Sequence, residues 1–314
     1  MRNSYLITGG FGLIGSALAN SLDGDVTILS RSDKNRGRVH STSVKTLIKD
    51  LNEITQEDVG SADVIFHLAS TVDNYNVLTN PYLDVETNIN GTIKLLEACK
   101  NLVKKPKIVF LSTFFVYGNE YEKSRTPINE ESKTDPLAIY PATKLCTESI
   151  IKLYSKLYSI PYLILRLTNV YGDEEQCDNK KKGALNYMIM QATKGETLRV
   201  YKGGNYYRDF LYVDDVVSAI NFLQEKNIEN DLFLVGYGEP VLFKDFMSYL
   251  HELTGKKSKI EEVDPPSFHN IVGIRSFVAD TSKINKLGWK ATINYKSGVE
   301  KIYKKYKLLL RDLS

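Results

Sequence analysis

The sequence predicts an α/β protein built on a doubly wound parallel sheet, with a smaller mixed α/β lobe towards the C-terminal end. Over the first two-thirds of the chain, short apolar runs alternate with longer amphipathic stretches. This alternation is typical of strands joined by crossover helices. Residues 64–66 and 108–111 are apolar at every position, as expected for strands that are buried on both faces.

The elements can be assigned in chain order from this pattern. Strands are predicted at residues 5–8, 26–29, 46–49, 64–68, 108–112 and 162–167, and helices at 14–22, 88–102 and 142–158. After Gly172 the alternation ends. A polar loop at 173–183, a strand at 232–235 and a loop at Pro265 and Pro266 follow. A basic amphipathic helix at 296–310 is expected to cover the second lobe rather than to anchor in a membrane.

Composition limits the kinds of partner. The 314 residues are 42% hydrophobic and 25% charged, and the net charge is +3. So small a charge favours a few local anion sites over binding to nucleic acid or to an anionic membrane. The three cysteines are widely spaced, which predicts neither disulfides nor a metal cluster and favours a reducing compartment. Because no secretion signal or membrane span is recognisable, the expected location is the cytoplasm.

A glycine-rich segment, residues 9–15, follows the first predicted strand. Gly9, Gly12 and Gly15 give the spacing GxxGxxG, a variant of the dinucleotide-binding fingerprint of Rossmann folds. Glycine permits the tight turn and lets a pyrophosphate approach the backbone. The free amides and the positive dipole of the following helix then favour the anion. The sequence therefore predicts an NAD(H) or NADP(H) site, one per subunit.

The adenosine end of that site is less clearly specified. An acidic residue that binds the ribose hydroxyls of NAD is expected about 20 residues after the glycines. Ser30 and Arg31 occupy this place and favour NADP, although Asp33 lies close by. Asp50, followed by Leu51, is a candidate acceptor for the adenine amino group. Residues 68–70 are expected to run beneath the cofactor, and for His67 a structural role is at least as plausible as a chemical one.

Tyr140 and Lys144 stand four residues apart and therefore share one face of a helix. A free tyrosine has a pKa of about 10, but a neighbouring ammonium favours the phenolate. Tyr140 would then exchange a proton with a hydroxyl of the substrate, and Lys144 would hold the nicotinamide ribose. Thr113, at the end of the fifth predicted strand, is expected to bond the same substrate oxygen. Ser112 is the alternative.

These motifs together resemble the extended short-chain dehydrogenase/reductases, in particular the nucleotide-sugar epimerases, dehydratases and reductases. The resemblance spans nearly the whole chain and includes residues 8–15, 67–69, 88–92, 113–118, 140–144, 166–172, 208–215 and 287–289. It implies a dinucleotide-binding domain of residues 1–171 plus about 207–236. It also implies a nucleotide-sugar lobe of about 172–206 plus 237–314, and a homodimer paired through the helices that carry Asn88 and Tyr140.

The resemblance also assigns roles to individual residues. Thr113, Tyr140 and Lys144 would form the catalytic triad, and Asn169, Arg208 and Arg275 would bind the substrate diphosphate. An ion pair of Arg208 with Asp209 or Asp214 is the alternative for that arginine. The full set of expected cofactor contacts is Gly9, Phe11, Gly12, Leu13, Ile14, Gly15, Ser30, Arg31, Asp50, Leu51, Leu68, Ala69, Ser70, Asn88, Tyr140 and Lys144.

The residues after Thr113 bear on the reaction. In the 4,6-dehydratases of this family an Asp–Glu pair follows the catalytic threonine, whereas here Phe114 and Phe115 stand there and cannot transfer protons. The cysteine–histidine pair of 3,5-epimerase/reductases has no convincing counterpart, since Cys177 lies in the polar loop. The chain is therefore expected to be a C4 epimerase or dehydrogenase of a nucleotide sugar. An NADPH-dependent 4-ketosugar reductase and a non-catalytic cofactor-binding protein are the alternatives.

Overall fold

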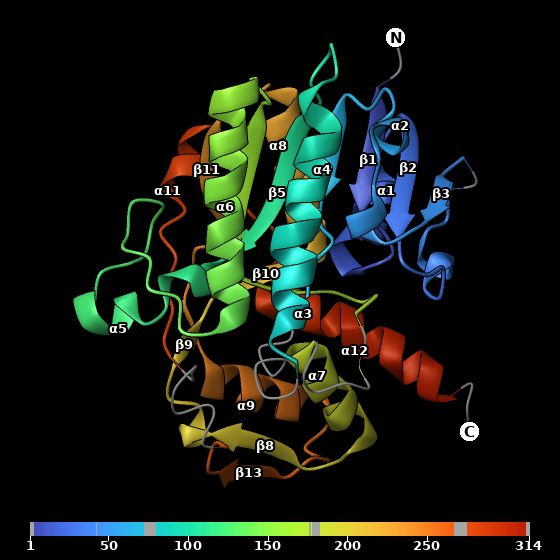
Figure 1. Cartoon of the computed structure of the whole chain (residues 1–314). Coiled ribbons are helices and arrows are strands. Elements are labelled where there is room, and N and C mark those ends of the chain that lie inside the picture. The colour runs from blue at the N-terminus through green and yellow to red at the C-terminus, as the bar shows by residue number, and fades with distance from the viewer. Residues whose placement is uncertain are drawn as a thin grey trace. The chain divides into compact units, whose positions relative to one another are not determined.

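A seven-stranded sheet forms the centre of the chain, as the computed structural model in Figure 1 shows. The structure describes residues 3–41, 43–71, 80–175, 177, 183–266 and 275–311. The strand order is β11-β6-β5-β4-β1-β2-β3. The strands are β1 (Ser4–Thr8), β2 (Asp25–Ser30), β3 (Lys45–Ile48), β4 (Val64–His67), β5 (Lys107–Thr113), β6 (Tyr162–Leu167) and β11 (Asp231–Val235).

The order from β3 to β6 is that of a doubly wound nucleotide-binding sheet. The pairs β2–β3, β1–β2, β1–β4, β4–β5 and β5–β6 are all parallel. The order reverses between β1 and β4, so the carboxyl ends of these two strands flank the place where such sheets bind their ligands. All seven residues of β5 are buried, which confirms the prediction from its uninterrupted apolar sequence.

The chain forms two compact units, and the first comprises the described residues of 1–116, 138–167 and 217–233. Helices cover the sheet of this first unit. They are α1 (Leu13–Ser21), α2 (Gln56–Val59), α3 (Tyr82–Asp84), α4 (Gly91–Lys100), α6 (Ile139–Tyr158) and α8 (Val213–Glu225), and a π-helix, η4 (Val85–Asn90), leads into α4. Figure 1 shows α4 and α6 side by side in front of β5. α8 is drawn behind the strands and contacts α1 through a hydrogen bond from Asn221 to Ser21 (3.4 Å).

The core of this unit lies between the sheet and the helices α4 and α6. Its fully buried members come from β4, β5 and β6 and from the inward faces of both helices, and include Ile65, Ile108, Ile164, Leu95 and Ile151. Burying an aliphatic side chain of this size contributes about 2 kcal/mol. The packing therefore fixes α6 over the carboxyl half of β5, where the predicted catalytic residues lie.

The second unit contains three small sheets, β7–β10, β9–β12 and β8–β13. Its strands are β7 (Asn169–Tyr171), β8 (Leu198–Tyr201), β9 (Tyr207–Arg208), β10 (Phe210–Tyr212), β12 (Val241–Leu242) and β13 (Ile260–Val263). Its helices are α5 (Glu120–Ser124), α7 (Ala184–Lys194), α9 (Phe243–Leu253), α11 (Ser282–Lys286) and α12 (Tyr295–Arg311). In the described ranges of the two units there are also 3-10 helices: η1 (Arg36–Arg38), η2 (Leu51–Glu53), η5 (Phe114–Tyr117) and η6 (Lys202–Gly204).

The boundary between the units differs from the predicted one. Residues 117–137, 168–171, 207–216 and 234–236 belong to the second unit, whereas the sequence placed them in the dinucleotide-binding domain. The reason is long-range backbone pairing. The amide of Ile128 donates to the carbonyl of Val278 (2.8 Å) and its carbonyl accepts from Asp280 (2.7 Å), and Phe210 pairs with Asn169 in the β7–β10 sheet. Contacts between segments that are far apart in the chain cannot be predicted from local sequence patterns.

The predicted C-terminal helix is confirmed as α12. It buries Gly298, Val299, Ile302 and Tyr306 and packs against α7 and α9 of the same unit. None of the helices in the described ranges is long and apolar enough to cross a membrane. The lysines at 180–182, expected on an exposed loop, lie outside the described residues.

Candidate active site

The three predicted catalytic residues meet at the end of β5. Thr113 is the last residue of β5, and Tyr140 and Lys144 lie on the first two turns of α6. The Tyr140 hydroxyl is hydrogen-bonded to the side chain of Thr113. The Lys144 ammonium lies 4.3 Å from the centre of the Phe110 ring, also on β5. The structure thus brings together three side chains that are up to 31 positions apart (113 to 144) in the sequence.

Burial dominates the electrostatics of these groups. Tyr140 is 8% exposed and Lys144 is 3% exposed. Burial raises the pKa of Tyr140 above its ordinary value, while its hydrogen bond with Thr113 lowers it. Burial lowers the pKa of Lys144 to about 7, and the charge of Glu148 opposes that shift. Both groups are therefore perturbed mainly by burial, and a lysine whose pKa lies near neutrality one turn from a buried tyrosine is typical of sites that exchange protons.

Asn88 fixes the wall of this site from the π-helix that precedes α4. Its side-chain amide donates to Thr143 (2.9 Å) and Thr71 (3.2 Å), and its side-chain oxygen accepts from Ser70 (2.9 Å) and the Thr71 amide (3.2 Å). Thr143 in turn donates to the carbonyl of Tyr140 (2.8 Å). Single π-turns are frequent at functional sites. Since the amide of Asn88 is committed internally, this residue positions α6, and its contact with a cofactor stays a prediction.

His67, at the end of β4, has a single consistent tautomer. The Thr8 hydroxyl accepts from the amides of Leu68 (3.2 Å) and Ala69 (3.1 Å) and therefore donates to His67 Nδ1 (2.9 Å). The Thr92 hydroxyl donates to the carbonyl of residue 88 (2.6 Å), so it accepts from His67 Nε2–H (2.8 Å). Burial lowers the pKa of His67 to about 3. His67 therefore acts as a neutral link between β1, β4 and α4, in agreement with a structural role.

The glycine loop fits a dinucleotide. Gly9 has φ +71°, and a Cβ there would lie 2.8 Å from the Ala69 amide nitrogen. A Cβ on Gly15 would lie 2.6 Å from the backbone of Gly10. Helix α1 has nine residues and begins after Gly12, without a side-chain cap and without an acidic residue in its first turn. These features leave its amino end open to an anion such as a pyrophosphate.

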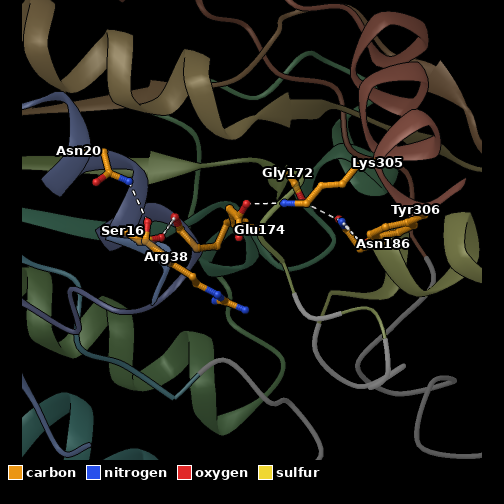
Figure 2. Close-up of polar contacts among 9 residues, drawn as sticks. Ser16, Asn20, Arg38, Gly172, Glu174, Asn186, Lys305 and Tyr306 are labelled. Carbon is orange, nitrogen blue, oxygen red and sulfur yellow. Dashed lines mark hydrogen bonds and ion pairs between the residues drawn. The ribbon is translucent and has the colours of Figure 1, made fainter. Parts of the chain in front are cut away.

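The residues expected to contact the adenosine part of the cofactor lie at or just after the ends of β2 and β3. Ser30 ends β2 and donates to the carbonyl of Ser32 (2.9 Å), and Arg31 is exposed beside it. Asp50 caps η2 by accepting from the amide of Asn52 (2.8 Å). As Figure 2 shows, Asn20 on α1 donates to the carbonyl of Arg38 (2.8 Å). This bond holds the segment after β2 against the helix that begins at the glycines.

The predicted diphosphate contacts lie in the second unit. Arg208 is half-buried, stacks on the Tyr206 ring (4.6 Å) and donates to the carbonyls of Tyr207 (3.0 Å) and Arg275. Burial, together with the charge of Arg275, lowers the pKa of Arg208 to about 10, although Tyr206 and Glu122 oppose the shift. Two guanidinium groups that repel each other in a partly buried place favour an anionic ligand.

The alternative partners of Arg208 are committed elsewhere. Asp209 is buried and accepts from the Thr168 hydroxyl (2.7 Å) and from the amides of Tyr237 (2.8 Å) and Gly238 (2.7 Å). Asp214 pairs with Lys301 (3.1 Å). The ion-pair interpretation of Arg208 therefore loses its support.

Asn169 begins β7, and its side chain donates to the carbonyl of residue 209 (2.9 Å). Figure 2 shows how the segment after β7 is held within the same unit. Asn186 donates to the carbonyl of Gly172 (2.7 Å) and to the Tyr306 hydroxyl (2.8 Å), and Lys305 pairs with Glu174. In the described part of the chain, no group of His, Cys, Asp and Glu is arranged to hold a metal.

Several positioning residues were not identified from the sequence. Thr8, Thr92 and Thr143 complete the network around His67 and Asn88, and Glu148 lies one turn beyond Lys144. Threonine and glutamate are common residues on strands and helices, so these positions carry no distinctive sequence motif. Their only sequence signal is the spacing of four residues between Lys144 and Glu148, and between Asn88 and Thr92.

Comparison with known proteins identifies the family. Residues 5–236 match the model of the NAD dependent epimerase/dehydratase family, so the chain belongs to this family. This confirms the resemblance seen in the sequence motifs.

Individual relatives agree with this assignment. A Methanocaldococcus jannaschii protein named "Putative UDP-glucose 4-epimerase" is 32% identical over 95% of this chain and 96% of its own length. UDP-glucose 4-epimerase of Thermotoga maritima, solved with UDP-glucose, is 25% identical, with a TM-score of 0.88 over 99% of this chain and 100% of that one. UDP-glucuronic acid 4-epimerase of Bacillus cereus, solved with UDP-glucuronic acid and NAD, is 27% identical, with a TM-score of 0.87 over 98% and 99%.

The neutral state of His67 predicts a pH dependence of stability. Its folded pKa, about 3, lies below the 6.5 of an unfolded histidine. As the pH falls through 6.5, the unfolded chain gains a proton that the folded chain does not, so stability is lost on the acid side. We expect this group to contribute a loss of about 2 kcal/mol between about pH 6.5 and pH 5. Urea unfolding at both pH values measures it.

His67→Gln should remove this part of the acid dependence, whatever it does to stability at neutral pH. His40→Gln, at an exposed position, serves as the matched control and should keep the wild-type dependence. An unchanged dependence in His67→Gln would show that His67 is protonated in the folded protein.

Proposed function

We propose that this protein is an NAD(P)-dependent 4-epimerase of UDP-sugars. The observation that carries the proposal is the buried set of Thr113, Tyr140 and Lys144 at the end of β5, in a chain of the NAD dependent epimerase/dehydratase family. The relatives that bind UDP-glucose and UDP-glucuronic acid supply the substrate class.

The side chains would divide the work as follows. The Tyr140 phenolate removes the proton of the sugar O4 hydroxyl, and Thr113 donates a hydrogen bond to the same oxygen. Lys144 as an ammonium favours the phenolate. The bound dinucleotide supplies reversible hydride transfer at C4. After the 4-keto sugar has rotated in the site, C4 would receive the hydride back on its opposite face while Tyr140 returns the proton to O4, so that the cycle ends without net oxidation.

The residues after Thr113 favour epimerisation over dehydration. Phe114 and Phe115 stack on each other with ring centres 4.2 Å apart. Eliminating water requires an acid and a base beside the sugar, and two phenyl rings supply neither. A non-catalytic role is disfavoured because all three reactive groups are retained.

The second unit would supply the site for the diphosphate. Arg208 and Arg275 offer planar forks that fit phosphate oxygens, and their mutual repulsion would be relieved by the bound anion. Asn169 would contact the diphosphate as well. Its side-chain amide has two N–H groups, and only one is needed for the bond to the carbonyl of residue 209.

Tyr140→Phe is the direct test of the reaction. We expect the variant to fold and to bind the dinucleotide, but to interconvert UDP-glucose and UDP-galactose, or the uronic acid pair, at least about 10²-fold more slowly. Tyr154→Phe on the same helix, whose hydroxyl bonds Glu97 (2.7 Å), is the control and should retain activity. Wild-type protein that turns over no UDP-sugar would refute the proposed function.

The choice of dinucleotide is a separate proposal. Arg31, exposed at the end of β2, is suited to a 2′-phosphate, and Ser30 offers no carboxylate to ribose hydroxyls. We expect NADPH to bind more tightly than NADH, and Arg31→Ala to weaken NADPH binding about tenfold while leaving NADH nearly unchanged. Fluorescence titration measures both affinities.

Lys34→Ala, on the same exposed segment, is the control for general charge. Preferential binding of NADH by the wild type would instead assign the relatives' cofactor, NAD, to this chain. Tight NADPH binding together with net reduction of a 4-ketosugar would favour the reductase alternative.

Helix α6 also supports the proposed homodimer. Ala142, Cys146, Ser149, Leu153 and Leu157 are exposed along one stripe of this helix, and Leu153 and Leu157 are 51% and 62% exposed. An apolar stripe on the outer face of a helix is typical of a helix–helix interface. Pairing of α4 and α6 with the same helices of a second copy would bury it.

Replacing Leu153 and Leu157 together by Glu should therefore convert a dimer into a monomer, because four carboxylates would face one another across a two-fold axis. Sedimentation velocity measures the change. The same replacement of Leu308 and Leu309, which are exposed on α12, is the control and should leave the dimer intact. A wild-type monomer at tens of micromolar would contradict the proposal.

A further inference from the structure

A charged pair lies fully inside the first unit, directly behind the catalytic helix. Glu148 on α6 is 1% exposed and Arg166 on β6 is 4% exposed. Arg166 Nε donates to Glu148 Oε1 (3.0 Å) and its terminal nitrogen NH2 donates to Oε2 (2.6 Å), so the pair is bidentate. The Ser112 hydroxyl, on β5, donates a further hydrogen bond to Oε1. One carboxylate therefore joins α6 to two adjacent strands.

The strand register explains why this contact is specific. Ser112 and Arg166 are direct partners in the parallel pair β5–β6. Both side chains meet the same carboxylate on α6. A shift of α6 along the sheet would leave a buried charge without its partner, which costs about 3–5 kcal/mol. The pair thus fixes the position of α6 along β5.

This position is the one that the catalytic residues need. Glu148 follows Lys144 by four residues and Tyr140 by eight, so the three side chains lie on the same side of α6. Ser112 directly precedes Thr113 on β5. Tyr140 and Lys144 therefore lie on the same helix as Glu148. Thr113 lies on β5 next to Ser112, which donates a hydrogen bond to Glu148.

The carboxylate also acts on the charge of Lys144. Burial disfavours the ammonium, and Glu148 is the charge that opposes this effect. The other ionisable groups around the triad do not replace it. His67 on β4 is neutral, Tyr140 is protonated at rest, and Asp84 on α3 acts on Tyr140. Arg166 on β6 weakens the field of Glu148 at Lys144, because its guanidinium carries the opposite charge.

We propose that Glu148 is a positioning residue, which holds α6 in register with β5 and places a negative charge one turn from Lys144, where it favours the ammonium. The catalytic part of this inference rests on the proposed function. The part that concerns Lys144 and the dinucleotide does not depend on which sugar is the substrate.

Two substitutions separate charge from geometry. Glu148→Gln keeps the shape and one acceptor oxygen but removes the charge, and its amide nitrogen is a donor where the second carboxylate oxygen accepts. Glu148→Asp keeps the charge but is one methylene too short to reach both strands. Dinucleotide affinity, measured by fluorescence titration between about pH 5 and pH 9, reports the protonation of Lys144, because the ammonium is the form expected to bind the nicotinamide ribose.

We expect the alkaline loss of affinity in Glu148→Gln to move to lower pH by about one unit, and the alkaline limb of kcat/KM to move with it. In Glu148→Asp the limb should stay at the wild-type pH, while kcat falls because α6 is displaced. Ser112→Ala, which removes one hydrogen bond and no charge, should also leave the limb in place. A merely structural role would lower stability in all three variants without moving the limb.

The inference is overturned if folded Glu148→Gln loses affinity at the same pH as the wild type. If Glu148→Gln does not fold, the double variant Glu148→Gln/Arg166→Met replaces the pair by neutral groups of similar size, which buried sites tolerate. It should show a smaller shift in the same direction, because the positive charge of Arg166 is removed as well. If the wild-type protein epimerises no UDP-sugar but Glu148→Gln still shifts the pH dependence of dinucleotide binding, the proposed function is refuted and this inference stands.

Discussion

The Thr8 hydroxyl and the His67 ring connect the parts of the cofactor site. Thr8 accepts from the two amides that follow β4 and donates to His67, whose other nitrogen bonds Thr92 on α4. This chain draws the end of β4 so close to the glycine loop that a Cβ on Gly9 would lie within 2.8 Å of its backbone. The site depends on this contact because a pyrophosphate can only reach the helix amides over a flat, side-chain-free turn.

A second buried polar centre fixes the catalytic helix. Asn88 holds the first turn of α6 through Thr143, and Glu148 holds the third turn through Arg166. Both are fully buried, where an unmatched polar group is costly and a matched one specifies a single arrangement. Apolar packing between α4, α6 and the sheet supplies stability, whereas the hydrogen bonds of Asn88 and Glu148 determine the position of α6 along β5. The reactive tyrosine and lysine inherit that position.

The two units divide the chemistry that the family requires. The first carries the dinucleotide loop and all three reactive side chains, and the second carries the arginines suited to a diphosphate. Residues 117–137 directly follow the catalytic strand and yet belong to the second unit, tied there by the bonds of Ile128 to residues 278 and 280. The chain thus passes into the second unit within four residues of Thr113, so the end of β5 and the second unit are closely connected in sequence.

The sequence by itself determined the parallel sheet, the glycine turn and the residues Thr113, Tyr140 and Lys144. Each of these depends on a short-range pattern, such as an apolar run, a glycine spacing or a spacing of four on one helix face. Only the tertiary structure decided the single tautomer of His67, the internal commitment of Asn88 and the joining of Glu148 to Ser112 and Arg166. It also decided to which unit residues 117–137 belong. These features depend on which distant side chains meet in the folded core, and a buried threonine or glutamate looks the same in sequence as an exposed one.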